Sequence, residues 1–233
     1  MEQLEAALFP DEDAEELLVK GYRIIQKRTG YRFGHDSVYL SAFATLHARD
    51  RVLDMGCGDG VLLFLLAARE ESMTGVGVER REDAADRAKR GVHLNGLEER
   101  LQIVCGDILN HPFERAAFDL VIANPPYWPQ SFADPEGART EAHLTPEDLA
   151  DAAAYALRPR GRLALIVPCA RLDAFLAPAF EKDFSLKRLQ MIHPSSSRPG
   201  RAALLELQIH TKRGGCAVLP PLTVRKEGNQ SGR

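Results

Sequence analysis

Four short apolar segments, each typical of a buried strand, follow one another in the chain, with helical patterns or turns between them. They span residues 51–55, 74–78, 101–105 and 118–123. Strands that alternate with helices predict an α/β fold, with a mostly parallel sheet and helices on both faces. Because the carboxyl ends of parallel strands share the edge where ligands bind, the polar residues at those ends are expected to line one site. These residues are Asp54, Glu79, Asp107 and Asn124.

A glycine-rich turn, Gly56-Cys57-Gly58-Asp59-Gly60, joins the first of these strands to an apolar helix expected over 61–69. Its glycines tolerate positive φ and allow the backbone to approach a ligand closely. The third glycine comes one residue earlier than in the G-x-G-x-x-G pattern of dinucleotide sites. The tighter turn leaves less room for a pyrophosphate, so it favours a compact zwitterionic ligand.

The next two strand ends suit the parts of an adenosine. Glu79 is placed to accept hydrogen bonds from a ribose diol. Asp107 is placed to accept one from an adenine amino group, with Ile108 packed on the ring. Each carboxylate also has a purely structural alternative, because Glu79 is suited to cap the helix expected over 82–94 and Asp107 is typical of the start of a loop.

The fourth strand leads directly into Asn124-Pro125-Pro126-Tyr127. Each proline removes a backbone donor and biases the residue before it toward extended or turn geometry, so the chain is held stiffly here. The Asn124 side-chain oxygen and the Pro125 carbonyl are two acceptors suited to a planar NH2 group, and Tyr127 can stack on the ring that carries it. A proline-rich turn with a core tyrosine is the alternative interpretation.

The rest of the chain extends the α/β pattern. A loose acidic helix or extension is expected over 1–18, and two short strands within 21–34. A helix capped by Asp36 or Ser37 follows, and a loop over 128–144 precedes a helix capped by Thr145. The last strands are expected at 162–167, 186–192 and 202–210, with the final two antiparallel. We therefore predict one domain over 21–213, with an acidic N-terminal extension over 1–20 and a C-terminal tail over 214–233.

Charge is unevenly distributed along a chain whose net charge is only −3. Residues 1–16 carry seven acids and no base, residues 17–32 carry five bases and no acid, and residues 182–233 carry ten bases and three acids. This asymmetry permits a face that meets a polyanion, although any one cluster is more typical of a solvated surface.

The cysteines and the hydropathy pattern indicate the cellular compartment in which the protein is expected. Four scattered cysteines without a C-x-x-C pair favour a reduced cytoplasmic protein over a disulfide framework or a zinc site, so no metal is expected. No apolar run reaches 18 residues, and the acidic N-terminus lacks a secretory signal pattern, so no membrane partner is expected.

Taken together, the 54–60 segment, Glu79, Asp107 and the Asn-Pro-Pro-Tyr motif resemble the motifs of class I methyltransferases that modify planar amines. The resemblance covers roughly residues 20–212 and implies a Rossmann-like seven-stranded sheet with a terminal antiparallel strand. It implies S-adenosylmethionine as cofactor and an adenine N6, guanine N2 or glutamine amide as acceptor. The implied cofactor contacts are Phe33, Asp36, Asp54, Gly56, Cys57, Gly58, Glu79, Arg80, Asp107, Ile108 and Asn124.

A narrower resemblance lies outside these motifs. Residues 22–26, 32–38 and 204–209 are similar to segments of bacterial valine-tRNA adenine-N6 methyltransferases, which act on the adenine 3′ of the anticodon. It implies an RNA substrate, most specifically tRNA, rather than DNA, and a segment around Phe33 that closes the cofactor pocket. The implied catalytic residues are Asn124, Pro125, Pro126 and Tyr127, and the implied substrate contacts are Tyr127, Arg139, His143, Lys27 and Arg28.

Four alternatives stay open at this point. A ribosomal-RNA adenine-N6 or guanine-N2 methyltransferase fits the same motifs. A protein glutamine methyltransferase shares the Asn-Pro-Pro-Tyr motif, but only about 50 residues precede the first strand of the sheet, fewer than that family's N-terminal helical domain needs. A non-catalytic RNA-binding protein on this fold is disfavoured by the intact motifs, and an NAD-dependent oxidoreductase by the glycine spacing.

Overall fold

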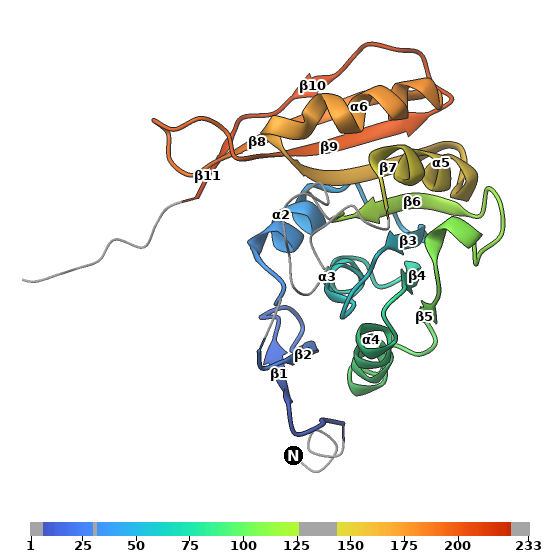
Figure 1. The fold of residues 1–233 in the computed structure, drawn as a ribbon, viewed down its shortest axis with the longest axis vertical. Helices are drawn as coiled ribbons and strands as arrows, with labels where there is room; N and C mark the ends of the chain where they lie inside the picture. Colours follow the sequence, from blue (N-terminus) through green and yellow to red (C-terminus); the bar gives the residue numbers. More distant parts are fainter. Residues whose placement is uncertain (1–6, 30–31, 126–143, 225–233) are drawn as a thin grey trace, which may run out of the picture.

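The computed structural model describes residues 7–29, 32–125 and 144–224. Its centre is a nine-stranded sheet in the order β10-β8-β9-β7-β6-β3-β4-β5, and β11 also pairs with β8 (Figure 1). The strands are β3 (Arg51–Met55), β4 (Thr74–Glu79), β5 (Leu101–Cys105), β6 (Phe118–Ala123), β7 (Leu157–Pro168), β8 (Phe184–His193), β9 (Ala202–Ile209), β10 (Ala217–Val218) and β11 (Leu222–Thr223).

Seven of these strands form the sheet that the sequence predicts. The strands β3 to β7 run parallel, and β9 lies antiparallel between β7 and β8. The predicted fold class and the antiparallel pair are therefore confirmed. The short strands β10 and β11 add to the free side of β8, so part of the segment expected as a tail pairs with the sheet.

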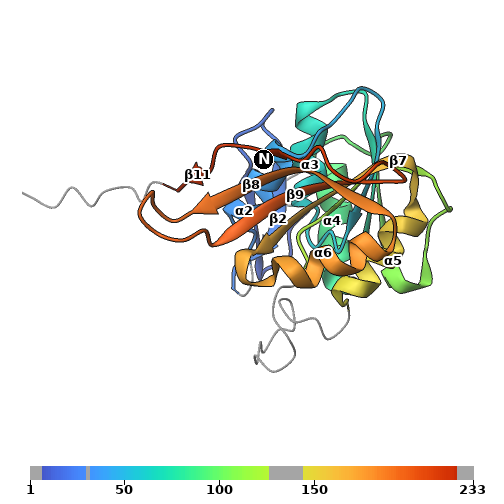
Figure 2. The same ribbon diagram turned by 90° about the horizontal axis from the view of Figure 1, so that it is seen from above.

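The helices cover both faces of the sheet because its strands are apolar on both sides. They are α2 (His35–Phe43), α3 (Val61–Arg69), α4 (Glu82–Leu94), α5 (Pro146–Ala156) and α6 (Leu172–Glu181), with 3-10 turns η1 (Ile108–Asn110) and η2 (Cys169–Arg171). Val52 packs in the core cluster that contains α2, α3 and α4 residues, whereas its neighbour Leu53 packs in the cluster with α5 and α6 residues. Figure 2 shows α5 and α6 together on one side of the sheet. None of the helices in the described ranges is long and apolar enough to cross a membrane.

A separate antiparallel pair joins β1 (Glu12–Glu16) to β2 (Arg23–Lys27). The sequence interpretation was wrong here, because it placed a loose helix or extension over 1–18 and both strands within 21–34. The acidic and basic stretches pair with each other instead. Arg32 forms ion pairs with Asp13 and Glu15, at 3.0 and 2.9 Å. Opposite charges across the pair compensate for a first strand that is poor in β-forming residues.

Two other local expectations need correction. Helix α2 begins after Gly34, which provides no side-chain cap, so neither Asp36 nor Ser37 caps it. Strand β7 begins at Leu157 rather than at residue 162, and a register shift opposite Phe118 and Leu120 accommodates the extra residues. The cap of α5 is confirmed, because the Thr145 hydroxyl accepts from the Asp148 backbone nitrogen at 3.1 Å.

Candidate active site

The glycine-rich turn after β3 forms the floor of the candidate site. Gly56, Gly58 and Gly60 have φ angles of 73°, 53° and 90°, a region that side chains disfavour. A Cβ atom at Gly56 or Gly58 would meet nothing within 4 Å, whereas one at Gly60 would lie 3.2 Å from the Phe64 ring. The first two glycines therefore leave the face of the turn open to a ligand, and the third is needed for packing.

Asp54 is the least compensated polar side chain of the site. It is completely buried, and within the described ranges neither of its carboxylate oxygens has a hydrogen-bond partner. Burial raises the pKa of Asp54 to about 8, and the nearby Glu79 charge adds to this effect. A buried carboxylate without a partner is costly, so the group retains its proton in the cofactor-free protein, and its position beside the open turn makes it a candidate for contact with a ligand group.

Glu79 connects the end of β4 to the glycine-rich turn. Its Oε2 accepts a hydrogen bond from the Gly58 nitrogen at 2.9 Å, and its Oε1 accepts one from the Arg81 nitrogen at 2.8 Å. The side chain is only 12% exposed. Since each carboxylate oxygen can accept a second bond, these contacts leave acceptor capacity toward the site. The sequence did not indicate that Glu79 also holds the turn.

The end of β5 is organised by Asp107. Its Oδ1 accepts a hydrogen bond from the Leu109 nitrogen at 3.0 Å and thereby begins the 3-10 turn η1. Ile108 is buried in the core on the α5 side of the sheet. The loop-starting role of Asp107 is therefore present, and the adenine contacts expected of Asp107 and Ile108 stay predictions. Arg80, just after β4, is exposed.

Asn124 lies at the end of β6, and its amide is held from the side by α2. Its Nδ2 donates to the Ser37 hydroxyl at 3.4 Å, and Ser37 is buried. This bond uses the amide nitrogen of Asn124 as the donor. It therefore agrees with the expected role of Oδ1, which is to accept a hydrogen bond from an amine. Sequence reasoning saw Ser37 only as a helix cap. The predicted residues Pro126, Tyr127, Arg139 and His143 lie outside the described residues.

A methyltransferase small domain model matches residues 36–185, well over half of the chain. The chain belongs to this family. It is 30% identical over 216 residues to a tRNA1(Val) (adenine(37)-N6)-methyltransferase of Tolumonas auensis, covering 91% of this chain and 89% of the relative. The relative of the same name from Aeromonas salmonicida is 32% identical over 169 residues, covering 70% and 71%.

Solved structures share the fold of this methyltransferase. A predicted O-methyltransferase, protein Atu636 from Agrobacterium tumefaciens, superposes with a TM-score of 0.69 at 21% identity and covers 84% of this chain and 90% of its own. The geranyl diphosphate C-methyltransferase from Streptomyces coelicolor has a TM-score of 0.58 at 14% identity, covering 74% and 77%. At these identities the likeness is one of architecture.

The segment before β3 contributes contacts around the methyltransferase site. Phe33 is half-buried against the core cluster that contains α2 and α3. Asp36 pairs with Arg201, at 2.6 Å between Oδ1 and Nη2. Two predicted substrate contacts are also engaged within the chain, because Lys27 Nζ lies 3.0 Å from Asp83 and Arg28 Nε donates to the Glu12 carbonyl at 2.9 Å.

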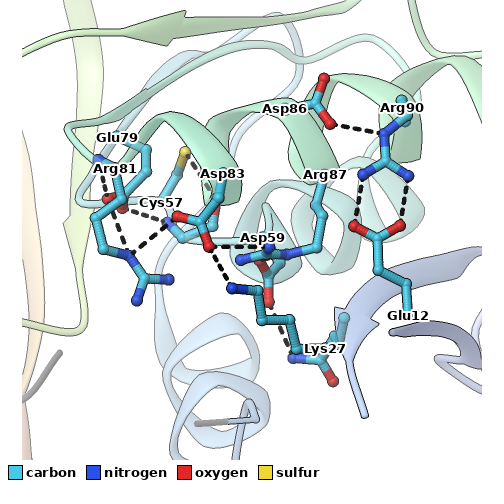
Figure 3. Close-up of polar contacts among 12 residues, drawn as sticks. Glu12, Lys27, Cys57, Asp59, Glu79, Arg81, Asp83, Asp86, Arg87 and Arg90 are labelled. Carbon is cyan, nitrogen blue, oxygen red and sulfur yellow. Dashed lines mark hydrogen bonds and ion pairs between the residues drawn. The ribbon is translucent and has the colours of Figure 1, made fainter. Parts of the chain in front are cut away.

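A buried ion pair supports the glycine-rich turn from below, and the sequence interpretation missed it. Arg87 of α4 is only 3% exposed, and its Nε donates to Oδ1 of Asp59 at 2.8 Å (Figure 3). Gln26 of β2 donates to the other Asp59 oxygen at 3.3 Å. The signal for this contact is an arginine on a helix face that is otherwise Ala84, Ala88 and Gly91. Arg87 of α4 and Gln26 of β2 thus hold the turn in place through Asp59.

We expect Arg87→Met to destabilise the methyltransferase by roughly 3 kcal/mol, because it leaves the Asp59 carboxylate buried without its counter-charge. The variant should also weaken cofactor binding, since Asp59 lies within the turn. Denaturant unfolding and calorimetry measure the two effects. Arg90→Met is the matched control, because Arg90 lies one turn further along α4 and pairs with Glu12 of β1 rather than with the turn. Equal losses of cofactor affinity in the two variants would contradict the supporting role of Arg87.

Proposed function

We propose that this methyltransferase transfers a methyl group from S-adenosylmethionine to N6 of adenine 37 in valine tRNA. The observation that carries the proposal is its similarity, over nearly the whole length of both chains, to proteins named as tRNA1(Val) (adenine(37)-N6)-methyltransferases. The site geometry supports the same chemistry. Scattered free cysteines and a tRNA substrate favour action in the cytoplasm.

The residues of the sheet edge fit S-adenosylmethionine. Asp54, which is buried and has no hydrogen-bond partner among the residues that the structure describes, suits a cationic ligand, and the open face at Gly56 and Gly58 allows a close approach to the backbone. Glu79 and Asp107 follow at the next two strand ends, where they suit a ribose and an adenine. When bound, the cofactor supplies an electrophilic methyl group on a sulfonium, so no covalent intermediate with the protein is needed.

The chain's own task is to position a poor nucleophile. The exocyclic amine of adenine delocalises its lone pair into the ring. The Asn124 side-chain oxygen and the Pro125 carbonyl are suited to accept the two amine protons, which favours a pyramidal nitrogen with its lone pair directed at the methyl group. Such positioning supplies up to roughly 7–11 kcal/mol in intramolecular precedents. The target base must also leave its stack in the anticodon loop, at a cost of a few kcal/mol.

Ser37 is proposed as the residue that orients the Asn124 amide. We expect Ser37→Ala to lower kcat roughly tenfold while leaving the KM for S-adenosylmethionine nearly unchanged, because one weak hydrogen bond to the amide is lost. Steady-state kinetics measures the split. Ser41→Ala is the matched control, since Ser41 is similarly buried one turn further along α2 and its hydroxyl donates to the Val38 carbonyl at 2.9 Å rather than contacting Asn124. If both variants lose kcat alike, the effect belongs to the helix and not to the amide.

The proposed reaction is tested by incubating the protein with labelled S-adenosylmethionine and total RNA from a strain that lacks its gene. The label is expected in N6-methyladenosine, at a single position in valine tRNA. Label in N2-methylguanosine or in ribosomal RNA would assign a different RNA substrate. Label in protein glutamine and none in RNA would reject an RNA substrate altogether.

A further inference from the structure

The connection between β8 and β9, residues 194–201, lies at the same edge of the sheet as the active site. Ala202, the first residue of β9, pairs with Pro168, the last residue of β7. Since β7 runs parallel to β6, which leads into Asn124, the connection and Asn124 emerge at one edge. Figure 2 shows the connection projecting beyond the body of the sheet on the side of α2.

Contacts on two sides anchor this connection next to Asn124. Arg201 forms an ion pair with Asp36 of α2, and the next residue of α2 is Ser37, which holds the Asn124 amide. On the other side, the Cys169 nitrogen of η2 donates to the Arg201 carbonyl at 3.1 Å. Two consecutive residues of α2 therefore link the connection to the catalytic amide: Asp36 pairs with Arg201, and Ser37 bonds to Asn124.

The connection is also folded by its own hydrogen bonds. The Arg198 nitrogen donates to the Ser195 carbonyl at 3.2 Å, and the Arg198 carbonyl lies 2.8 Å from Nδ1 of His193. Ser196 and Ser197 are exposed. A structured turn therefore presents the Arg198 side chain to solvent together with serine hydroxyls, and guanidinium and hydroxyl groups are the usual donors to phosphate oxygens.

Arg198 differs in charge and position from the other basic residues that are candidates for contact with RNA. In the N-terminal pair, Arg32 and Lys27 are neutralised by ion pairs with carboxylates. In the C-terminal part, Lys212 and Arg213 follow the end of β9, which pairs with the beginning of β7 at the opposite edge of the sheet. Within the described ranges Arg198 is exposed and forms no ion pair, so its charge is available at the reacting edge.

We propose that the β8–β9 connection binds the phosphate backbone of the RNA substrate, with Arg198 as its principal contact. The proposal rests on the proposed function and adds to it the surface that orients the RNA. Contacts to phosphates fix the register and orientation of a nucleic acid without reading its sequence. A phosphate held here places the neighbouring nucleotide beside Asn124.

The test compares Arg198→Glu with Lys212→Glu, an exposed charge reversal at the opposite edge of the sheet. The dissociation constant for unmodified valine tRNA is measured over a range of salt concentrations, and the affinity for S-adenosylmethionine is measured as a check of folding. We expect Arg198→Glu to bind tRNA about tenfold more weakly, with a salt slope reduced by about one, and Arg198→Lys to retain most of the affinity. Lys212→Glu should stay within about twofold of the original protein.

Each outcome decides between the proposals. Unchanged tRNA affinity in Arg198→Glu, or equal losses in Arg198→Glu and Lys212→Glu, would overturn the binding surface while leaving the proposed function intact. If the unaltered protein neither binds nor methylates RNA, the proposed function itself fails and the surface with it. If Arg198→Glu loses S-adenosylmethionine affinity as well, Arg198→Lys decides, because retained tRNA affinity there supports the phosphate contact and a loss as large as that of Arg198→Glu rejects it.

Discussion

Asn124→Ala should lower kcat for methyl transfer at least about 100-fold while leaving the affinity for S-adenosylmethionine within about twofold. The expected loss is comparable to that seen when one preorganised polar group is removed from other active sites. Asn124 follows the last residue of β6, and its amide bonds to Ser37. The substitution therefore removes the acceptor oxygen for the amine and leaves the strand intact. Single-turnover kinetics and calorimetry separate the chemical step from binding.

Asn124→Asp provides the informative comparison. An aspartate keeps an acceptor oxygen in place but loses the donor that bonds to Ser37 Oγ. We expect its kcat to fall between those of the original protein and Asn124→Ala. Full activity of Asn124→Ala on its RNA substrate would refute the catalytic role, and a parallel loss of cofactor affinity would reassign Asn124 to cofactor binding.

Asp54→Asn should have opposite effects on stability and on cofactor binding. The pKa of Asp54 is raised from 3.8 to about 8 in the folded chain, because its carboxyl is completely buried. Between these two values the folded state retains a proton that the unfolded state has released. The stability of the original protein must therefore fall as pH rises through this window, whereas the amide of the variant does not titrate.

At pH 8 we expect the cofactor-free Asp54→Asn variant to be at least about 2 kcal/mol more stable than the original protein, since one pKa unit corresponds to about 1.4 kcal/mol. Its affinity for S-adenosylmethionine should fall, because a cationic ligand no longer meets a carboxylate. Denaturant unfolding at pH 5 and pH 8 with calorimetry measures both effects. If Asp54→Asn is less stable than the original protein by the same amount at both pH values, and binds the cofactor with unchanged affinity, then Asp54 has a structural role only.

The sheet and its rim were predictable because their signals are local and agree with one another. Helices α3 and α4 have the expected bounds, since each follows a short apolar strand and a turn. Helix α3 is a continuous apolar run that is buried over its first seven residues, and α4 has one small apolar face and one charged face. A parallel sheet then places all carboxyl ends at one edge, so the neighbourhood of Asp54, Glu79 and Asn124 follows from the order of the elements alone.

The contacts that support the rim come from tertiary structure and escaped prediction. β1 is an acidic segment with low strand propensity that pairs only because a basic segment lies opposite. Ser37 has the local signature of a helix cap, and its contact with Asn124 depends on the tertiary packing that brings α2 to the end of β6. Arg87 lies on a helix face of small residues, which is a local signal, but its partner Asp59 is 28 residues away in the chain.

We propose that the edge of the sheet with Asp54, Glu79 and Asn124 methylates N6 of adenine 37 in valine tRNA. The most direct measurement uses a valine tRNA transcript, labelled S-adenosylmethionine and mass spectrometry of the digested RNA, with a transcript that carries guanine in place of adenine 37 as control. One N6-methyladenosine per tRNA is expected in the first transcript and none in the second. Equal labelling of both transcripts, or N6-methyladenosine at another position, would contradict the assignment.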